Sequence, residues 1–455
     1  MNRHNRVCIG VVATVALVAP ALGDEPVPQQ VIVTLVPGHT IEEVLADYTE
    51  YGPIEVIGAI DSAQTYLLLT PEDQDESEIE DLLEKDVRID EAESNEEFQS
   101  VEGQTQSFYL NVLPGDFSEQ PAFEIIELAE VAGTIAGSGV TVALLDTGID
   151  SSHELLAGRI AAGGWNFISG TDDVSDVGTG IDQDGDGAID EMVGHGTFMA
   201  GLIAGIAPSA SILPVKVLNG DGRGDLFTVA QGIYHAVDSG ADVINLSLAV
   251  EDGEDFLVAS IEHAVAAGVP VIVAAGNLGS GAEMYLVESA ETISVAGTDE
   301  VDVKCQFSNF AEHIKLSAPA CSVVSTVPGN GYAEWEGTSM SAAMTAATVA
   351  LLLSAAPELT PGQVEDVLES SAAGIDAANP EYAGLLGSGR LDIAAALAMV
   401  VPTMPSPDLN GDGLVDVVDV TLLIGAWGAG DSPFDLDESG TVDVGDLVIL
   451  ISHWN

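Results

Sequence analysis

Short apolar runs alternate with amphipathic stretches between residues 139 and 300. The apolar runs have few polar interruptions, which is typical of strands buried on both faces, and the stretches between them have helical spacing. Alternating strands and helices predict an α/β fold, a parallel sheet with helices on both faces. Strands are expected at 140–146, 211–218, 241–248, 269–276 and 292–297, and helices at 196–207, 226–240 and 255–268.

A different pattern precedes this domain. Residues 29–93 show the order strand, helix, strand, helix, strand, which predicts a small α+β unit. Turn signals at 113–116 and a helical pattern over 122–133 form the lead-in to the next domain. We therefore expect the small unit over 24–105 and the large domain over 106–400.

The end of the chain contains an internal repeat. Residues 401–407 are Pro-rich, as is typical of a linker. Beyond them, similar stretches begin at Asp408 and Asp435, 27 residues apart, and each carries a tryptophan 19 residues later, at Trp427 and Trp454. Such a repeat predicts a separate small, α-helical module over 408–455.

The charge of the chain narrows the range of partners. The sequence has 74 acidic residues against 10 Lys plus Arg, a formal net charge of −64. Nucleic acids and anionic membrane surfaces attract basic patches, so neither is an expected partner. A saline or calcium-rich setting and an acidic bias of the whole lineage both remain open as explanations.

The first residues have the pattern of a secretory signal peptide. Arg3 and Arg6 precede a short apolar run, and small residues stand before a cleavage position ahead of Asp24. A permanent membrane anchor is disfavoured because the run is short and Pro20 interrupts it. We expect removal of 1–23, no membrane span afterwards, and a secreted or cell-surface protein.

Polar residues follow the buried strands, at the edge where functional groups of parallel sheets gather. Asp146 ends the first strand, and His195 opens a helix after an acidic loop. Asn277 follows the fourth strand, and Ser339 begins a later apolar helix. Together they supply a carboxylate that orients a base, the base itself, an amide donor for an oxyanion and a nucleophile.

The motifs ALLDTGID, GHGTFMAG, INLSLA, VAAGN and GTSMSAA occur in this order, and over 119–400 the chain resembles the subtilisin-like serine proteases. The resemblance implies an endopeptidase that cleaves polypeptides through an acyl-enzyme. Asp146 would hold the imidazole of His195, which would take the proton of Ser339, and Asn277 would bind the oxyanion. Backbones flanking an extended substrate would come from Ser247, Leu248, Ala249, Ala275, Gly276 and Gly222.

The resemblance also implies that 24–105 is a propeptide, which assists folding and inhibits the site until it is cut. The sequence departs from the family at Ala249, where Gly is usual, and at Ala343 and Met344, where a Pro-His pair is usual. Neither change removes a catalytic group. The alternative is an inactive surface or docking protein that keeps the protease fold, but inactive relatives tend to lose a triad member.

The two C-terminal repeats match calcium loops, which need oxygen ligands at positions 1, 3, 5, 7, 9 and 12 and Gly at 6. A short Asp at position 12 and a helix that ends near Trp resemble the dockerin module, which implies structural calcium and a cohesin-like docking partner. A purely structural calcium clip is the alternative. The expected ligands are Asp408, Asn410, Asp412, the Leu414 carbonyl, Asp416 and Asp419, and then Asp435, Asp437, Ser439, the Thr441 carbonyl, Asp443 and Asp446.

A further acidic loop precedes His195. Acidic residues at alternate positions of this loop predict another calcium site. Position 12 of the loop falls on Val193, so Glu191 would have to substitute as a ligand. The alternative is a solvated acidic loop. His195 is not an expected ligand because calcium prefers oxygen. The expected ligands are Asp182, Asp184, Asp186 and Asp190.

Two cysteines remain once the signal peptide has been removed, Cys305 and Cys321. In an oxidising compartment they could form a single disulfide, and two buried free thiols are the alternative. The sequence leaves both possibilities open.

Overall fold

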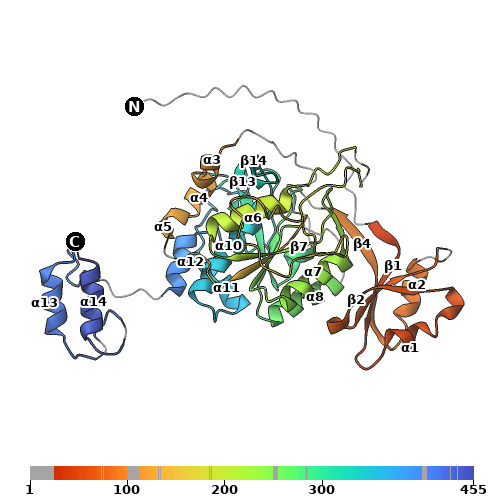
Figure 1. Cartoon of the computed structure of the whole chain (residues 1–455), viewed down its shortest axis with the longest axis horizontal. Coiled ribbons are helices and arrows are strands. Elements are labelled where there is room, and N and C mark those ends of the chain that lie inside the picture. Colours follow the sequence, from red (N-terminus) through yellow and green to blue (C-terminus); the bar gives the residue numbers. More distant parts are fainter. Residues whose placement is uncertain are drawn as a thin grey trace, which may run out of the picture.

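The structure is a computed structural model (Figure 1). The expected signal peptide, 1–23, and the linker residues 402–406 lie outside the described residues. The structure describes residues 25–72, 74, 76–99, 112–131, 133, 135–183, 185, 187–248, 255–281, 285–401, 407–430, 432–437 and 439–454.

The large domain is built on a seven-stranded sheet with the order β12-β11-β10-β9-β5-β7-β6. Its strands pair in parallel, and every residue of β9 to β12 is buried. The predicted α/β fold with a parallel sheet is thus confirmed. The strands are β5 (Thr141–Asp146), β6 (Trp165–Asn166), β7 (Ser211–Lys216), β9 (Val243–Leu246), β10 (Val271–Ala274), β11 (Thr292–Thr298) and β12 (Leu316–Pro319).

Helices cover both faces of this sheet (Figure 1). On one face α10 packs directly on β9 to β12 and on α6, and on the other α7 and α8 pack side by side. Among the described residues α10 is the one helix long and apolar enough to cross a membrane, and 89% of it is buried inside the domain, as expected of a core helix. The helices are α6 (His195–Ile206), α7 (Leu226–Asp238), α8 (Asp255–Ala266), α9 (Tyr285–Glu288), α10 (Thr338–Ala355), α11 (Pro361–Ser371) and α12 (Ile393–Val400).

The lead-in forms short helices instead of one continuous helix over 122–133. The helix is interrupted at Glu127, because its left-handed φ of +59° ends a helical turn. The Gln120 side chain anchors this segment because it pairs with both backbone groups of Val324 at 2.9 and 3.0 Å. The elements concerned are α3 (Pro114–Ser118), α4 (Pro121–Ile125) and α5 (Leu128–Val131), and the hairpin β13 (Val323–Val327) and β14 (Gly331–Trp335).

The small N-terminal unit is α+β, as predicted, but it contains an additional strand, β2. This strand escaped prediction because it lies at the sheet edge, where Val56 and Ile57 are both exposed and the expected alternation is lost, with a register shift before Gly58. The elements are β1 (Glu25–Leu35), α1 (Ile41–Leu45), β2 (Glu55–Ile60), β3 (Thr65–Leu69), α2 (Glu76–Leu83) and β4 (Ile89–Gln99).

A strand of the large domain completes the N-terminal sheet, whose order is β2-β3-β1-β4-β8. Strand β8 (Arg223–Asp225) pairs antiparallel with the end of β4. Phe98 of β4 and Phe227 of α7 are buried in one hydrophobic cluster at this contact. The two units are therefore joined by backbone hydrogen bonds and by apolar packing.

The C-terminal module consists of two short helices, α13 (Val417–Gly425) and α14 (Val444–Ser452). They enclose a small core in which Val415 and Val442, and likewise Leu423 and Leu450, are equivalent residues of the two repeats, 27 positions apart. This core consists of Val415, Leu423, Leu436, Val442 and Leu450.

Candidate active site

Asp146 and His195 meet at the carboxyl edge of the central sheet. Asp146 is the last residue of β5 and His195 the first of α6. Both are buried, and Nδ1 of His195 lies 2.8 Å from Oδ1 of Asp146. Because an ionised carboxylate can only accept, Nδ1 carries the hydrogen, and Nε2 is left as the basic nitrogen. This is the tautomer that a general base requires.

Aromatic packing fixes the plane of the imidazole. The indole of Trp335 stands edge to face with His195 at 5.5 Å between ring centroids, and it contacts Phe198 on the next turn of α6 in the same way. Trp335 is 3% exposed, so it also shields the His195–Asp146 hydrogen bond from water. The prediction missed this residue, although it lies only four positions before Ser339.

A second buried carboxylate, Asp176, holds the segments that carry the pair. Its Oδ1 accepts hydrogen bonds from the Thr147 hydroxyl at 3.1 Å and from the Gly194 N–H at 3.0 Å. Its Oδ2 accepts from the N–H and hydroxyl of Thr197 at 3.1 and 2.6 Å. Asp176 therefore ties the turn after β5 to the start of α6, and burial raises its pKa.

Lys216 lies buried close to these carboxylates. Its Nζ donates to the carbonyl of Thr147, and burial lowers the pKa of this lysine despite the nearby Asp176 and Asp146. The sequence held a clue to Lys216, since a lysine inside an apolar strand must find partners when buried. The sequence held no clue to the role of Asp176, because this residue is one of many acidic residues between 172 and 191.

Ser339 is the second residue of α10, and reciprocal hydrogen bonds tie it to Ser247, just beyond β9. The Ser339 hydroxyl donates to the Ser247 carbonyl and the Ser247 hydroxyl to the Ser339 carbonyl, both at 3.1 Å. Because β9 and β5 are neighbours, this contact places the starts of α10 and α6 at the same sheet edge. The dipole of α10 places partial positive charge at the start of the helix, which favours negative charge near Ser339.

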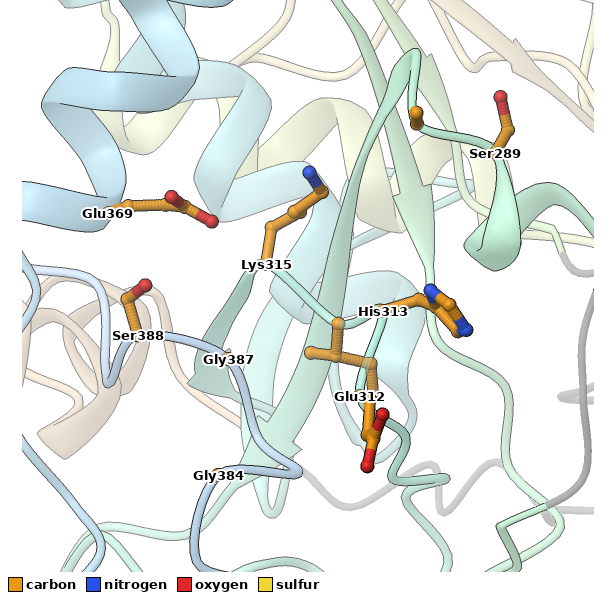
Figure 2. Close-up of a pocket in the computed structure, with 10 residues that line it drawn as sticks. Ser289, Glu312, His313, Lys315, Glu369, Gly384, Gly387 and Ser388 are labelled. Atoms are coloured by element: carbon orange, nitrogen blue, oxygen red, sulfur yellow. The ribbon is translucent and has the colours of Figure 1, made fainter.

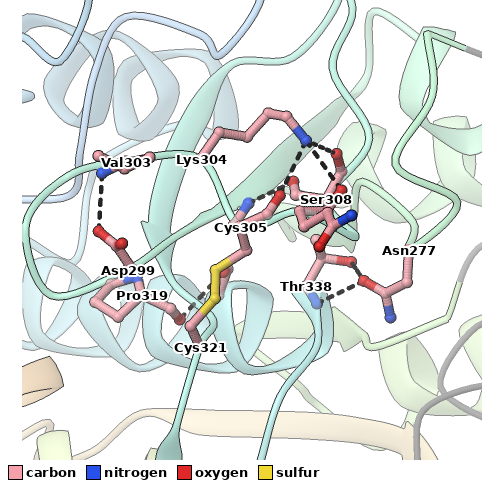
Figure 3. Close-up of a disulfide and its surroundings, with 12 residues drawn as sticks. Asn277, Asp299, Val303, Lys304, Cys305, Ser308, Pro319, Cys321 and Thr338 are labelled. Carbon is pink, nitrogen blue, oxygen red and sulfur yellow. Dashed lines mark hydrogen bonds between the residues drawn. A yellow bond between two sulfur atoms is a disulfide. The ribbon is translucent and has the colours of Figure 1, made fainter. Parts of the chain in front are cut away.

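Asn277 lies beside Ser339, in the loop after β10. Its Oδ1 accepts hydrogen bonds from the backbone N–H and hydroxyl of Thr338, at 2.9 and 3.0 Å (Figure 3). With the amide oxygen held towards Thr338, the amide NH₂ points away from it and can serve as a donor. Thr338 was not predicted, but it is the residue that orients this amide.

The predicted substrate-binding residues differ in burial and in whether their backbone groups are already hydrogen-bonded. Leu248 is buried, and Ala249 lies outside the described residues. The N–H of Ala275 is hydrogen-bonded to Val295, and both backbone groups of Gly276 are hydrogen-bonded, to Thr338 and Asn309. Gly222 leads into β8 with a φ of +77°. The assignment of these residues to substrate binding remains a prediction. The strand β8, which follows Gly222, pairs with another strand of the protein, β4.

The model of the Subtilase family matches residues 137–390, more than half of the sequence. This chain belongs to the subtilase family. It is 38% identical to thermitase of Thermoactinomyces vulgaris over 228 residues, 48% of this chain and 76% of thermitase. It is 35% identical to subtilisin BL of Lederbergia lenta over 271 residues, 58% of this chain and 92% of the relative. The protein is thus a serine endopeptidase of the subtilisin family.

The solved structure of fervidolysin from Fervidobacterium pennivorans, described as a keratinolytic enzyme related to subtilisin, supports the same fold. It superimposes with a TM-score of 0.67 at 21% identity, covering 84% of the subtilase chain and 62% of fervidolysin. At this identity the likeness concerns the fold alone.

The C-terminal loops of the subtilase gather carboxylates around backbone N–H groups. Oxygens of Asp435, Asp437 and Asp446 lie within 4.8 Å of one another, close enough to share one cation. In the first repeat Asp419 accepts hydrogen bonds from Asp416 and from two other residues. These bonds, that of Asp416 foremost, hold the pKa of Asp419 below its usual value, so this carboxylate is ionised at neutral pH.

Several of the remaining predicted ligands of these loops accept backbone hydrogen bonds that hold the loops and the helix starts. Asp416 and Asp443 cap the N-termini of α13 and α14. Asp408 accepts from the N–H groups of Gly411 and Gly413, both at 2.8 Å, which closes the tight turn of the first loop. The other members are Asn410, Asp412, Leu414, Ser439 and Thr441.

The acidic loop before His195 is described only in part, because Asp184 and Asp186 lie outside the described residues. Asp182 accepts from the N–H of Gly185 at 2.6 Å. Asp190 accepts from two backbone N–H groups, at residues 179 and 180, both at 2.7 Å. Calcium binding in this loop remains a prediction.

A separate pocket of about 370 Å³ lies away from the candidate active site (Figure 2). It is lined by Glu312, His313, Lys315, Glu369 and Ser388, among others. Lys315 immediately precedes β12, so the pocket lies at the amino edge of the sheet, opposite the edge that carries Ser339.

Proposed function

We propose that this subtilase cleaves peptide bonds with Ser339 as nucleophile, His195 as general base, Asp146 as its orienting carboxylate and Asn277 as oxyanion donor. The observation that carries this assignment is the buried 2.8 Å hydrogen bond between Asp146 and Nδ1 of His195, which selects the basic tautomer. The substitution Ser339→Ala tests it by removing the nucleophilic hydroxyl, and a large loss of kcat is expected.

Nε2 of His195 takes the hydroxyl proton as Oγ of Ser339 bonds to the substrate carbonyl carbon, and the carbonyl oxygen becomes an oxyanion. The Asn277 NH₂ donates to that oxygen. Collapse expels the amine, which receives the proton from His195. Water, activated by the same imidazole, hydrolyses the resulting ester and restores Ser339.

We further propose that residues 24–105 are an inhibitory propeptide and that the enzyme is secreted as a zymogen. In support of this, β4 pairs with β8. An extended substrate would otherwise bind along this strand edge. Glu97 and Arg223 form an ion pair of 2.8 Å across the contact. Buried Asn95 accepts from the N–H of Phe227 and donates to Asp225, at 3.1 Å each.

The substitution Asn95→Leu is expected to weaken inhibition. Leucine fills a similar volume but leaves the Phe227 N–H without its acceptor, a loss of about 1–3 kcal/mol, or roughly 5- to 150-fold in the inhibition constant. The measurement is the inhibition constant of polypeptide 24–105 against the mature enzyme. Asp90→Asn, an exposed change on the same strand, is the control. Equal constants for the Asn95 and Asp90 variants would contradict an inhibitory role for this contact.

We also propose that the C-terminal module binds structural calcium and docks onto a cohesin-like partner. Three pairs of exposed apolar residues recur at equivalent positions in its two helices and just after them. Exposed apolar groups in a repeated arrangement suit a protein-binding face. The pairs are Val417 with Val444, Ile424 with Ile451, and Trp427 with Trp454.

Removing Asp419 and Asp446 together is expected to abolish two calcium sites. Each carboxylate holds its loop closed and would supply the ligand at position 12. Calorimetric titration of calcium into full-length Ser339→Ala protein, which cannot digest itself, should lose two equivalents in the Asp419→Ala, Asp446→Ala variant. The exposed pair Glu358→Ala, Glu381→Ala is the charge-matched control. Unchanged stoichiometry in the Asp419, Asp446 variant would refute the assignment.

A further inference from the structure

Cys305 and Cys321 form a disulfide, with 6.3 Å between their Cα atoms. Cys305 follows β11, and Cys321 comes two residues after β12, the neighbouring strand. The bridge therefore links two loops at the carboxyl edge of the sheet, the edge that also carries Ser339. Figure 3 draws the bridge together with Asn277 and Thr338.

The Cys321 side of the bridge leads to the start of α10. The carbonyl of the adjacent Ala320 accepts a hydrogen bond from Gly337 at 3.0 Å, and the Ala320 N–H donates to Thr298 at 2.9 Å. Gly337 is the N-cap of α10 and immediately precedes Thr338, which holds the amide oxygen of Asn277. One hydrogen bond and one peptide unit thus connect the Cys321 loop to the residue that orients Asn277.

The Cys305 side leads to the loop that carries Asn277. The Cys305 carbonyl accepts from Ser308 at 3.1 Å, and Asn309 follows. The Asn309 N–H donates to the Gly276 carbonyl at 3.0 Å, and its Oδ1 accepts from the Leu278 N–H at 3.0 Å. Asn309 therefore holds the two residues that flank Asn277 in sequence.

A buried cation stiffens this second loop. Nζ of Lys304 donates to the carbonyls of Cys305 and Ser308 at 2.9 and 2.6 Å (Figure 3). It also lies over the rings of Phe310 and Tyr382, at 5.4 and 5.0 Å from their centroids. The loop is thus held internally by Lys304 and fastened to the neighbouring loop by the disulfide.

We propose that the Cys305–Cys321 disulfide is a positioning element for the Asn277 amide. It locks together the two loops that hold Asn277, one through Thr338 and the other through Asn309. Neither cysteine touches the reacting atoms, so the bridge acts on the geometry of the oxyanion donor and not on substrate binding. The inference rests on the role of Asn277 in the proposed function.

A double-mutant cycle on the mature enzyme tests the proposal, with kcat and KM measured on a peptide substrate. Asn277→Ala is expected to lower kcat about 10²- to 10³-fold. Cys305→Ser, Cys321→Ser is expected to lower kcat roughly tenfold through a small displacement of the donor, with KM unchanged. Combining the three substitutions should lower kcat no further than Asn277→Ala alone, because the bridge acts through that amide.

Each outcome of the cycle decides a different point. Unchanged kcat in Asn277→Ala would overturn the proposed function at this residue, and the present inference with it. Unchanged kcat in the cysteine variant, with the full Asn277 effect, would overturn the disulfide proposal alone. Multiplicative losses in the combined variant would also overturn it, because the bridge would then act independently of Asn277.

Reduction of the folded wild type covers the case in which the cysteine variant does not fold. Dithiothreitol followed by iodoacetamide should lower kcat roughly tenfold, as in the variant, while near-ultraviolet circular dichroism stays unchanged. Reoxidation of a non-alkylated sample should restore kcat. Loss of the dichroism signal together with activity would overturn the proposal, since the bridge would then hold the domain as a whole.

Discussion

Ser339→Ala is expected to lower kcat about 10⁶-fold, a magnitude taken from removal of the equivalent serine in a related subtilisin, and to leave the chain uncut near residue 105. The alanine removes the nucleophilic oxygen and its hydrogen bond to the Ser247 carbonyl, but it keeps the helix start and the Ser247 side-chain bond to the residue-339 carbonyl. Secreted wild-type and variant chains, compared on a gel in calcium with N-terminal sequencing of the products, show the result.

Ser341→Ala is the matched control for that experiment. Ser341 is buried on the same helix, and its hydroxyl donates to the carbonyls of Ala318 and Pro319 at 2.9 and 3.2 Å. Its loss should cost about 1 kcal/mol of stability and leave processing intact. Cleavage of Ser339→Ala at the wild-type rate would mean that the nucleophile is another residue or that another protease cuts the chain.

Asp146→Asn is expected to lower kcat about 10⁴-fold, whereas Asp176→Asn should lower it about tenfold at most. Both carboxylates are buried near His195, but the structure shows a hydrogen bond from Nδ1 to Asp146. An amide at 146 can present its NH₂ to Nδ1, which places the ring hydrogen on Nε2 and removes the base. Kinetics of both purified variants with one peptide substrate make the comparison.

Asp176→Asn should instead appear as a loss of stability. An amide at 176 accepts on only one oxygen, so donors of Thr147, Gly194 or Thr197 lose a partner, at about 1–3 kcal/mol. Urea unfolding of the two variants in the Ser339→Ala background measures this loss. A larger kcat deficit in Asp176→Asn than in Asp146→Asn would exchange the roles assigned to the two carboxylates.

The α/β class and the candidate residues were predictable because both rest on local rules. Strands buried on both faces are continuous apolar runs, and residues after parallel strands must meet at one edge. Asp146 is the last residue of such a strand, and Asn277 and Ser247 follow two others. The closed C-terminal loops were predictable for a similar reason, since the carboxylate and the glycine that close each loop lie within twelve consecutive residues.

The sequence by itself thus determined the class of fold, the residues at the sheet edge and the two-repeat module. Only the tertiary structure decided which acid among 172–191 is buried at the site, because burial of Asp176 depends on α6 and β5 meeting above it. It likewise decided the pairing of Cys305 with Cys321, which requires β11 and β12 to be neighbours. Contacts between segments far apart in sequence carry no local pattern, and long-range packing alone fixes them.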